Sequence, residues 1–179
     1  MQSQRTLVLI KPEAVERKLI GRIISRFEDL DLNLVAMKML VASEQLVRKH
    51  YTDDKEWVTT VGGKTLGTYQ EYGRDPHLEF NTDDAYEIGK QIREWLVNYM
   101  TSGPVVALVL EGNHAVELVR KVAGKTIPLF AEPGTIRGDF SSDSPDLANP
   151  EKRPVLNLVH ASGTVEEARS EIALWFGDL

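Results

Sequence analysis

A histidine, His160, stands between a short apolar run and a helical pattern near the end of the chain. The run 155–159 predicts a short buried strand, and Thr164 with Glu167 three positions later predicts a capped helix start. Catalytic groups are often placed where a strand gives way to a loop on a rigid scaffold. Position alone favours the simpler alternative, a structural histidine that forms a hydrogen bond at a strand end.

The residues that follow His160 suit phosphoryl chemistry. A neutral imidazole can attack phosphorus if one ring nitrogen keeps its lone pair and the other donates its proton to an orienting acceptor. Glu171 lies two turns into the following helix, and Ser162 lies between the two residues. A turn after the strand would fold this helix back so that Glu171 reaches the ring. The alternative interpretation is that Glu171 is a solvated helix residue.

Residues suited to binding phosphate stand at the ends of other predicted elements. Arginine supplies paired donors for phosphate oxygens, lysine supplies a point charge, and threonine and asparagine supply neutral hydrogen bonds. The candidates are Lys11, Arg120, Arg137, Thr126 and Asn157. Each basic residue alone is more simply a solvated surface residue, but their combination near a histidine in an acidic protein favours a phosphate site.

The spacing of Asn157 and His160 constrains the strand. Residues three apart on a regular strand point to opposite faces. If both side chains serve one site, Asn157 lies before the strand or the strand bends there. The strand is then expected to begin near Leu158.

Two Gly-Lys-Thr segments and three further histidines do not indicate a functional site by themselves. The segments 63–65 and 124–126, both Gly-Lys-Thr, resemble the end of a P-loop, but Val58 and Val119 occupy the positions where its first glycine is required. The remaining histidines are expected to be solvated or locally bonded: His50, His77 and His114.

The composition limits the function classes. The chain has 179 residues, a net charge of −6 and no cysteine, which suits one domain (1–179) without disulfides or thiolate metal sites. The negative charge disfavours broad nucleic-acid binding, so no specific nucleic-acid partner is expected. No apolar stretch approaches the roughly 20 residues that span a bilayer, and no signal-peptide pattern opens the chain. We therefore expect a cytoplasmic protein with no membrane partner.

Strands and helices interleave along the chain. Apolar runs or alternations predict strands at 6–10, 35–41 and 105–110 in addition to the run before His160. Helical spacing of apolar residues predicts helices at 20–30, 43–51, 85–99, 116–124 and 164–177. This order indicates an α/β domain, or an α+β domain of the split βαβ type.

Three segments lack clear periodicity. Residues 52–84 are polar and rich in glycine, and they are predicted to be an insertion or a long functional loop. Residues 126–135 are predicted to form an irregular, proline-punctuated loop. Residues 141–153 are predicted to be a second, exposed insertion.

Five ordered motifs resemble the nucleoside diphosphate kinase family, almost from end to end of the chain. They are the first strand with its lysine (6–13), the His-Tyr pair (50–51), the third-strand entry (99–106), the arginine segment (133–140) and the histidine segment (157–162). The resemblance implies a ferredoxin-like domain with a four-stranded antiparallel sheet covered by helices. It also implies ping-pong transfer of the γ-phosphate of a nucleoside triphosphate, mainly ATP, to a nucleoside diphosphate through phosphohistidine at His160.

The resemblance also implies roles for the candidate residues. Lys11 would act at the reacting phosphate, and Glu171 and Ser162 would support His160. The phosphates and sugar would be bound by Lys11, Tyr51, Arg120, Thr126, Arg137 and Asn157. Mg²⁺ would be carried by the nucleotide phosphates with no direct protein ligand. The loop 126–135 resembles one that takes part in family oligomer contacts, so a dimer-based homo-oligomer, a tetramer or a hexamer, is expected.

The chain departs from the family pattern in places. The family joins the His-Tyr pair to the third-strand entry by a shorter segment that contains a base-stacking ring, and Trp57 is the candidate for that ring here. The segment 141–153 is also longer than usual, and Ala161 replaces a glycine. If the insertions block the site, the alternative is a nucleotide-binding or regulatory module with the same fold and little turnover.

Overall fold

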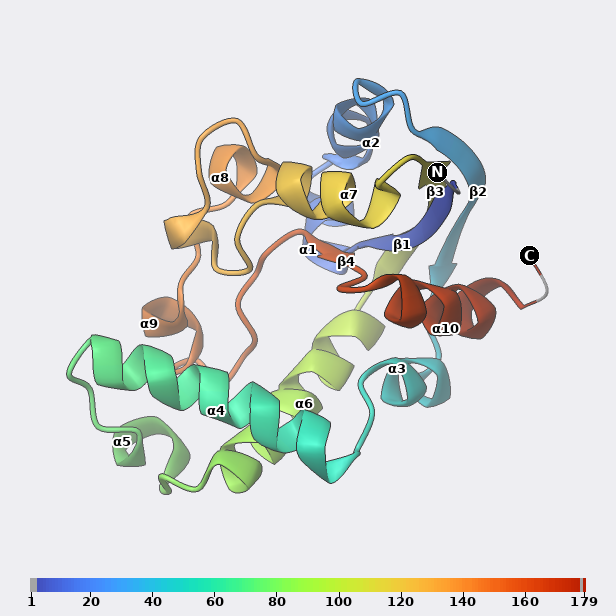
Figure 1. Ribbon diagram of the computed structural model, residues 1–179. Coiled ribbons are helices and arrows are strands. Elements are labelled where there is room, and N and C mark those ends of the chain that lie inside the picture. Colours follow the sequence, from blue (N-terminus) through green and yellow to red (C-terminus); the bar gives the residue numbers. More distant parts are fainter. Residues whose placement is uncertain (1–2, 178) are drawn as a thin grey trace.

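The computed structural model describes residues 3–177 and 179, and these contain a four-stranded sheet (Figure 1). All neighbouring strands are antiparallel, in the order β2-β3-β1-β4. The strands are β1 (Gln4–Ile10), β2 (Asn33–Val41), β3 (Pro104–Gly112) and β4 (Val159–Ala161). With its covering helices this is an α+β domain, which confirms the ferredoxin-like sheet that the family resemblance implies.

Strand β1 lies between β3 and β4 and is buried on both faces. Its side chains Leu7, Val8, Leu9 and Ile10 are fully buried, as the unbroken apolar run predicts. Because successive side chains point to opposite faces, Val8 and Ile10 join one core and Leu7 and Leu9 join another. Leu9 pairs with His160 of β4, so the candidate nucleophile lies beside the most buried strand.

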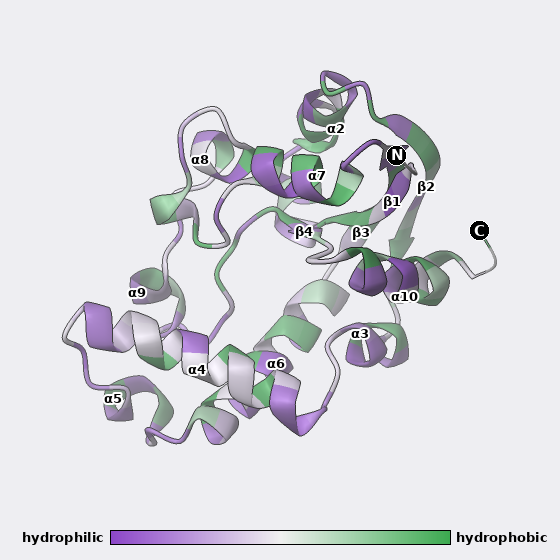
Figure 2. Ribbon diagram, viewed as in Figure 1, coloured by the Kyte–Doolittle hydropathy of each residue, from purple (hydrophilic) through white to green (hydrophobic). Residues whose placement is uncertain are grey.

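Helices cover both faces of the sheet (Figure 1), and polar and apolar residues alternate along α7 and α10 (Figure 2). One core is shared by α1 (Pro12–Glu16), α2 (Ile20–Glu28), α7 (Ala115–Ala123) and α8 (Ile136–Phe140). The other core is shared by α3 (Glu44–His50), α6 (Ala85–Thr101) and α10 (Val165–Phe176). The loop before α8 contains the 3-10 turn η1 (Pro128–Phe130). None of the described helices is both long and apolar enough to cross a membrane.

Residues 52–84 are largely helical, so the expectation of a loop was wrong. They form α4 (Lys55–Glu71) and α5 (His77–Phe80). The Asp54 carboxylate caps α4 by accepting a hydrogen bond from the Trp57 backbone N–H at 3.0 Å. Glycines and threonines occupy much of α4, so the helix lacks the apolar stripe by which periodicity detects helices.

Glycines replace that stripe where α4 packs on α6. A Cβ atom on Gly62 of α4 would overlap the carbonyl oxygen of Ala85, and one on Gly89 of α6 would overlap the carbonyl oxygen of Val58. The two backbones therefore approach more closely than any larger residue allows.

The segment 141–153 is not simply exposed. It contains the short helix α9 (Pro145–Ala148), and both Asp143 and Asn149 are buried. The Asn149 amide donates a hydrogen bond to the Tyr69 hydroxyl of α4 at 3.0 Å. The two segments expected to be separate insertions therefore contact each other.

Strand β2 forms an edge of the sheet, as the strand order shows. Its predicted apolar alternation is confirmed, but those side chains point away from the core. Val35, Met37, Met39 and Val41 are 37%, 54%, 58% and 66% exposed. We call these four residues the β2 patch.

Candidate active site

Strand β4 is shorter than the apolar run before His160 suggests. It begins at Val159, one residue after the expected start. Leu158 has φ +69°, and the Val159 N–H donates to the Asn157 carbonyl oxygen at 2.8 Å. This i to i+2 bond with positive φ is a γ-turn of the strained kind. The turn lets the side chains of Asn157 and His160 face the same side of the chain, and both line the same cavity.

Two contacts and full burial hold the strained turn. The Leu158 side chain is fully buried in the core. Its N–H donates to a Glu13 carboxylate oxygen at 2.7 Å, and its carbonyl accepts from the Lys11 N–H at 2.9 Å. Strained conformations of this type persist only where the surroundings over-determine them.

A cavity of about 460 Å³ opens beside the turn. Seven residues proposed from the sequence line it: Lys11, Tyr51, Arg120, Thr126, Arg137, Asn157 and His160. Leu96 and Lys125 also line it and were not singled out from the sequence. Four of the lining residues are basic and none is acidic, so the cavity suits a polyanion despite the net charge of −6.

Burial makes the charged forms of Lys11 and Arg137 less favourable. The Lys11 ammonium donates to the Asn157 side-chain oxygen at 2.6 Å. Burial lowers the pKa of Lys11 to about 8, and nearby Arg137 acts in the same direction while Glu13 opposes. Burial likewise lowers the pKa of Arg137 to about 10, with Arg120 adding to the shift. An anionic ligand would offset this cost, because an opposite charge favours the charged form.

The Arg137 guanidinium also has a structural role. It donates to the backbone carbonyl oxygens of Asn157 at 3.1 Å, Gly124 at 2.7 Å and Val159 at 2.7 Å. These three bonds join α8, the loop after α7 and the turn before His160. Since guanidinium has five N–H donors, two of them remain for a ligand.

Helix α10 begins as predicted and carries Glu171 to His160. Thr164 caps it by accepting from the Glu167 N–H at 3.1 Å. The Glu167 carboxylate accepts from the Gly163 N–H at 2.8 Å, one residue earlier than in a standard capping box. This turn directs the helix back over the end of β4.

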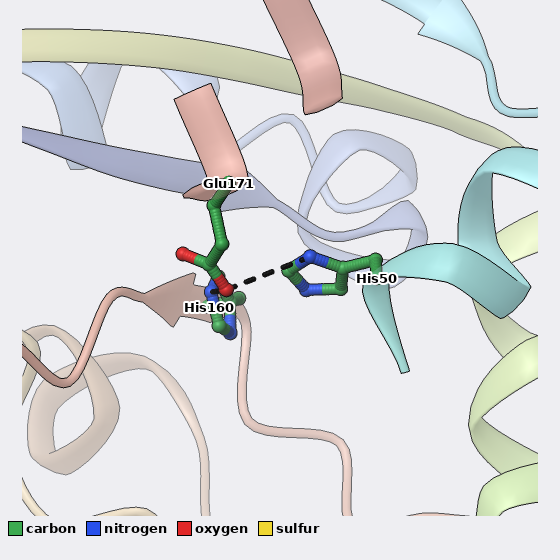
Figure 3. Close-up of side chains that lie close together, drawn as sticks. All are labelled: His50, His160 and Glu171. Carbon is green, nitrogen blue, oxygen red and sulfur yellow. Dashed lines mark ion pairs between the residues drawn. The ribbon is translucent and has the colours of Figure 1, made fainter. Parts of the chain in front are cut away.

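The expected contact between Glu171 and His160 is present (Figure 3). A Glu171 carboxylate oxygen, Oε1, lies 2.7 Å from His160 Nε2. Among the described residues His160 Nε2 has no hydrogen-bond partner, so the carboxylate and the ring are in close contact without a formed hydrogen bond. The other oxygen, Oε2, accepts from the Ser162 hydroxyl at 2.6 Å. Burial raises the pKa of Glu171, while His50 and Ser162 oppose the rise.

His50 also belongs to this group, so the expectation of a solvated or locally bonded residue was wrong. Its side chain is 1% exposed, and Nδ1 lies 3.5 Å from Glu171 Oε1 (Figure 3). Nδ1 also accepts from the Trp175 indole N–H at 3.3 Å. Burial lowers the pKa of both His50 and His160 to about 3, and the nearby Lys11 acts in the same direction on both rings. Glu171 opposes the shift at His50 and Glu167 opposes it at His160, but both rings stay neutral. The one sequence signal for His50 was its place in the His-Tyr pair.

These three side chains also bring one potential metal ligand each within 4.8 Å of one another. The charges of Lys11 and Arg137 act on His160 and oppose a cation there. The arrangement therefore fits an oriented nucleophile for an anionic substrate better than a metal centre.

Trp57 does not lie where a base-stacking ring was expected. It is absent from the residues that line the cavity, and its ring packs 6.1 Å from the ring of Tyr51 against the second core. A second cavity, of about 340 Å³, adjoins the first and shares Lys11, Leu96, Thr126 and Asn157 with it.

Comparison with known proteins identifies the family. A family model described as "Nucleoside diphosphate kinase" matches residues 4–59 and 84–179. The nucleoside diphosphate kinase of Pyrobaculum aerophilum is 53% identical over 176 residues, covering 98% of this chain and 96% of the relative.

Solved structures that resemble this chain belong to the same family. The crystal structure of an NDP kinase from Pyrobaculum aerophilum has a TM-score of 0.94 at 51% identity, covering 99% of this chain and 97% of that one. A transition-state mimic of the nucleoside-diphosphate kinase from Borrelia burgdorferi, with bound vanadate and ADP, has a TM-score of 0.77 at 35% identity, covering 98% of this chain and 88% of that one. The chain therefore belongs to the nucleoside diphosphate kinase family and is a phosphotransferase of that class.

Proposed function

We propose that this kinase transfers the γ-phosphate of a nucleoside triphosphate, mainly ATP, to a nucleoside diphosphate through phosphohistidine at His160. One observation carries the proposal. The neutral ring of His160 has a carboxylate against Nε2 and lines a cavity with four basic residues.

The ring geometry assigns the nucleophile. Because Nε2 is buried against Glu171, Nδ1 is the nitrogen that attacks. Its lone pair forms the N–P bond as the bond from the γ-phosphorus to the β–γ bridging oxygen breaks, and that electron pair leaves with the diphosphate product. The proton stays on Nε2, where Glu171 stabilises the positive charge that develops on the ring. A second diphosphate then attacks the phosphorus and restores neutral His160.

The cations of the cavity would bind the phosphates. Arg137 offers its two remaining N–H donors, and Arg120 offers a full guanidinium from the solvent side. Lys11, held by Asn157, adds a point charge at the reacting group. Alignment and charge neutralisation account for most of the catalysis in phosphoryl transfer.

Mg²⁺ would fit this site bound to the nucleotide phosphates, without a direct protein ligand. None of the described residues that line the cavity is a carboxylate, whereas Mg²⁺ prefers oxygen ligands that include carboxylates or substrate phosphates. Carried by the nucleotide phosphates, the ion would neutralise charge that develops during transfer. The residues of the chain would contact the metal through the phosphates.

The base and sugar would lie in the second cavity, on the side away from His160. Its apolar walls include Ile92, Trp95, Leu96 and Val155. An apolar slot that continues from a phosphate site suits a nucleoside base, and this proposal replaces Trp57 as the base contact.

The β2 patch supports a homo-oligomer. An exposed apolar face on an edge strand is typical of an interface, because such edges otherwise invite non-specific pairing. A second copy of the chain would bury Met37, Met39 and Val41. The assembly of dimers into a tetramer or hexamer stays a prediction from the sequence, and so does the cytoplasmic location.

Labelling with γ-labelled ATP tests the proposal. Incubation with Mg²⁺ should give a protein-bound label that is labile in acid, stable in alkali and transferable to added GDP. His160→Ala should abolish the label, whereas the exposed control His77→Ala should retain it. EDTA should stop labelling, and excess Mg²⁺ should restore it. A folded wild-type protein that binds nucleotide without taking up label would instead be a binding or regulatory module.

A further inference from the structure

The outer wall of the second cavity is made by a part of the chain that the family model does not match. Four residues of α4 line this cavity: Val61, Lys64, Thr65 and Thr68. All four lie in the stretch 60–83, between the two matched segments. This part of α4 therefore adds a wall to the second cavity, and its residues lie outside the pattern that the family model describes.

The wall presents a lysine and two hydroxyl groups on one helix face, at positions that share a side of an α-helix. Thr65 donates to the Val61 carbonyl at 3.3 Å, and Thr68 donates to the Lys64 carbonyl at 3.1 Å. Their hydroxyl protons are therefore in use. Within the described chain, the Lys64 ammonium has no hydrogen-bond or ion-pair partner, so it is the free donor of this wall.

Contacts on two sides hold the helix of this wall in place. On one side the glycine contacts at Gly62 and Gly89 lock α4 against α6. On the other side Tyr69 accepts from Asn149, and Arg74 pairs with Asp146 of α9. A side chain on such a braced helix has a defined reach into the cavity, as specific recognition requires.

We propose that Lys64 selects nucleotides by the base, favouring a carbonyl oxygen at the position farthest from the sugar over an amino group there. Guanine has O6 and thymine has O4 as acceptors, whereas adenine and cytosine have an amino donor. The lysine ammonium donates but does not accept, so it can bond the carbonyl oxygen of the first pair, whereas the second pair binds without this hydrogen bond. The inference rests on the proposed function, since it needs the base in the second cavity while the phosphates lie in the first.

Acceptor competition tests the inference. The ratio of kcat/KM for GDP to that for ADP is measured with ATP as donor in wild type, Lys64→Met and Lys64→Glu. Because Lys64 is exposed, its hydrogen bond is of ordinary strength, and Lys64→Met should lower the ratio about three- to tenfold. Lys64→Glu should lower it further and favour ADP. The control Lys55→Met removes a lysine from the same helix outside the cavity and should leave the ratio unchanged.

The outcomes separate the two proposals. If both Lys64 variants keep the wild-type ratio within twofold, the base-selection proposal is wrong even though transfer proceeds. If the wild type forms no phosphoenzyme, the proposed function fails. Calorimetric binding of GDP and ADP to wild type and Lys64→Met then still decides whether Lys64 distinguishes the bases.

Discussion

Arg137→Ala should damage both stability and catalysis, because the arginine binds the backbone as well as facing the cavity. Its guanidinium donates to three carbonyl oxygens and is buried. Removing it leaves these acceptors without their partner next to the strained turn at Leu158. The phosphate-binding role proposed for Arg137 accounts only for a loss of transfer, and the backbone hydrogen bonds add the cost in stability.

The magnitude follows from the number of bonds. Each lost hydrogen bond costs about 1 kcal/mol or more when its acceptor stays buried, so the free energy of unfolding should fall by about 3 kcal/mol. That is a large part of the roughly 5–15 kcal/mol typical of a domain. Arg120 provides the matched control, because it lines the same cavity but is exposed. Arg120→Ala should stay within about 1 kcal/mol of wild type.

Urea unfolding at one protein concentration, with labelling from γ-labelled ATP, measures both effects. Both variants should lose transfer by more than tenfold, a loss of about 1.4 kcal/mol in transition-state binding, but only Arg137→Ala should lose stability. If Arg137→Ala unfolds within about 1 kcal/mol of wild type, the carbonyl bonds contribute little and the structural role is refuted. Transfer within threefold of wild type would refute the phosphate-binding role.

Three further predictions concern packing, protonation and assembly. Gly62→Ala should destabilise the chain and separate α4 from α6. Gly63→Ala, whose added Cβ meets nothing within 4 Å, should be neutral or stabilising by up to about 1 kcal/mol. Thermal unfolding of the two variants measures the difference, and equal melting temperatures would contradict this prediction. The pKa values of His50 and His160 are lowered from 6.5 to about 3, so their NMR signals should not titrate between pH 8 and 5. Because the unfolded chain binds more protons than the folded chain in this range, these two histidines should lower the free energy of unfolding as the pH falls from about 6.5 towards 3. A titration midpoint above pH 5.5 for either ring, measured by NMR, would contradict the burial argument. Met39→Glu should reduce the molar mass measured by light scattering, and an unchanged mass would exclude the β2 patch from the interface.

The sequence determined the elements whose signals are local. The apolar run of β1, the capped start of α10 at Thr164 and the proline and glycine breaks around the third strand are each encoded within a few residues. The residue types at element ends indicated phosphate chemistry at His160, and the family resemblance implied the antiparallel sheet. The structure brings the proposed residues together, while their individual roles stay predictions.

The sequence did not show α4, because its packing depends on glycines rather than an apolar stripe. Gly62 has no periodic signature of its own, and its effect arises only when Ala85 of another helix lies against it. The part of α4 that carries Lys64 was consequently taken for a loop, and the glycine-lysine-threonine motif around Lys64 was set aside because it lacks a P-loop's first glycine.

The tertiary structure alone decided how the active-site side chains are held. His50 and Trp175 are far apart in sequence yet share a hydrogen bond, and Arg137 reaches three carbonyls from different segments. Local patterns carry no information about such contacts, because they depend on where distant elements pack. The chain's own residues thus specify a histidine, basic groups and their places at element ends, whereas burial by the whole fold keeps His160 neutral and aims it at the cavity.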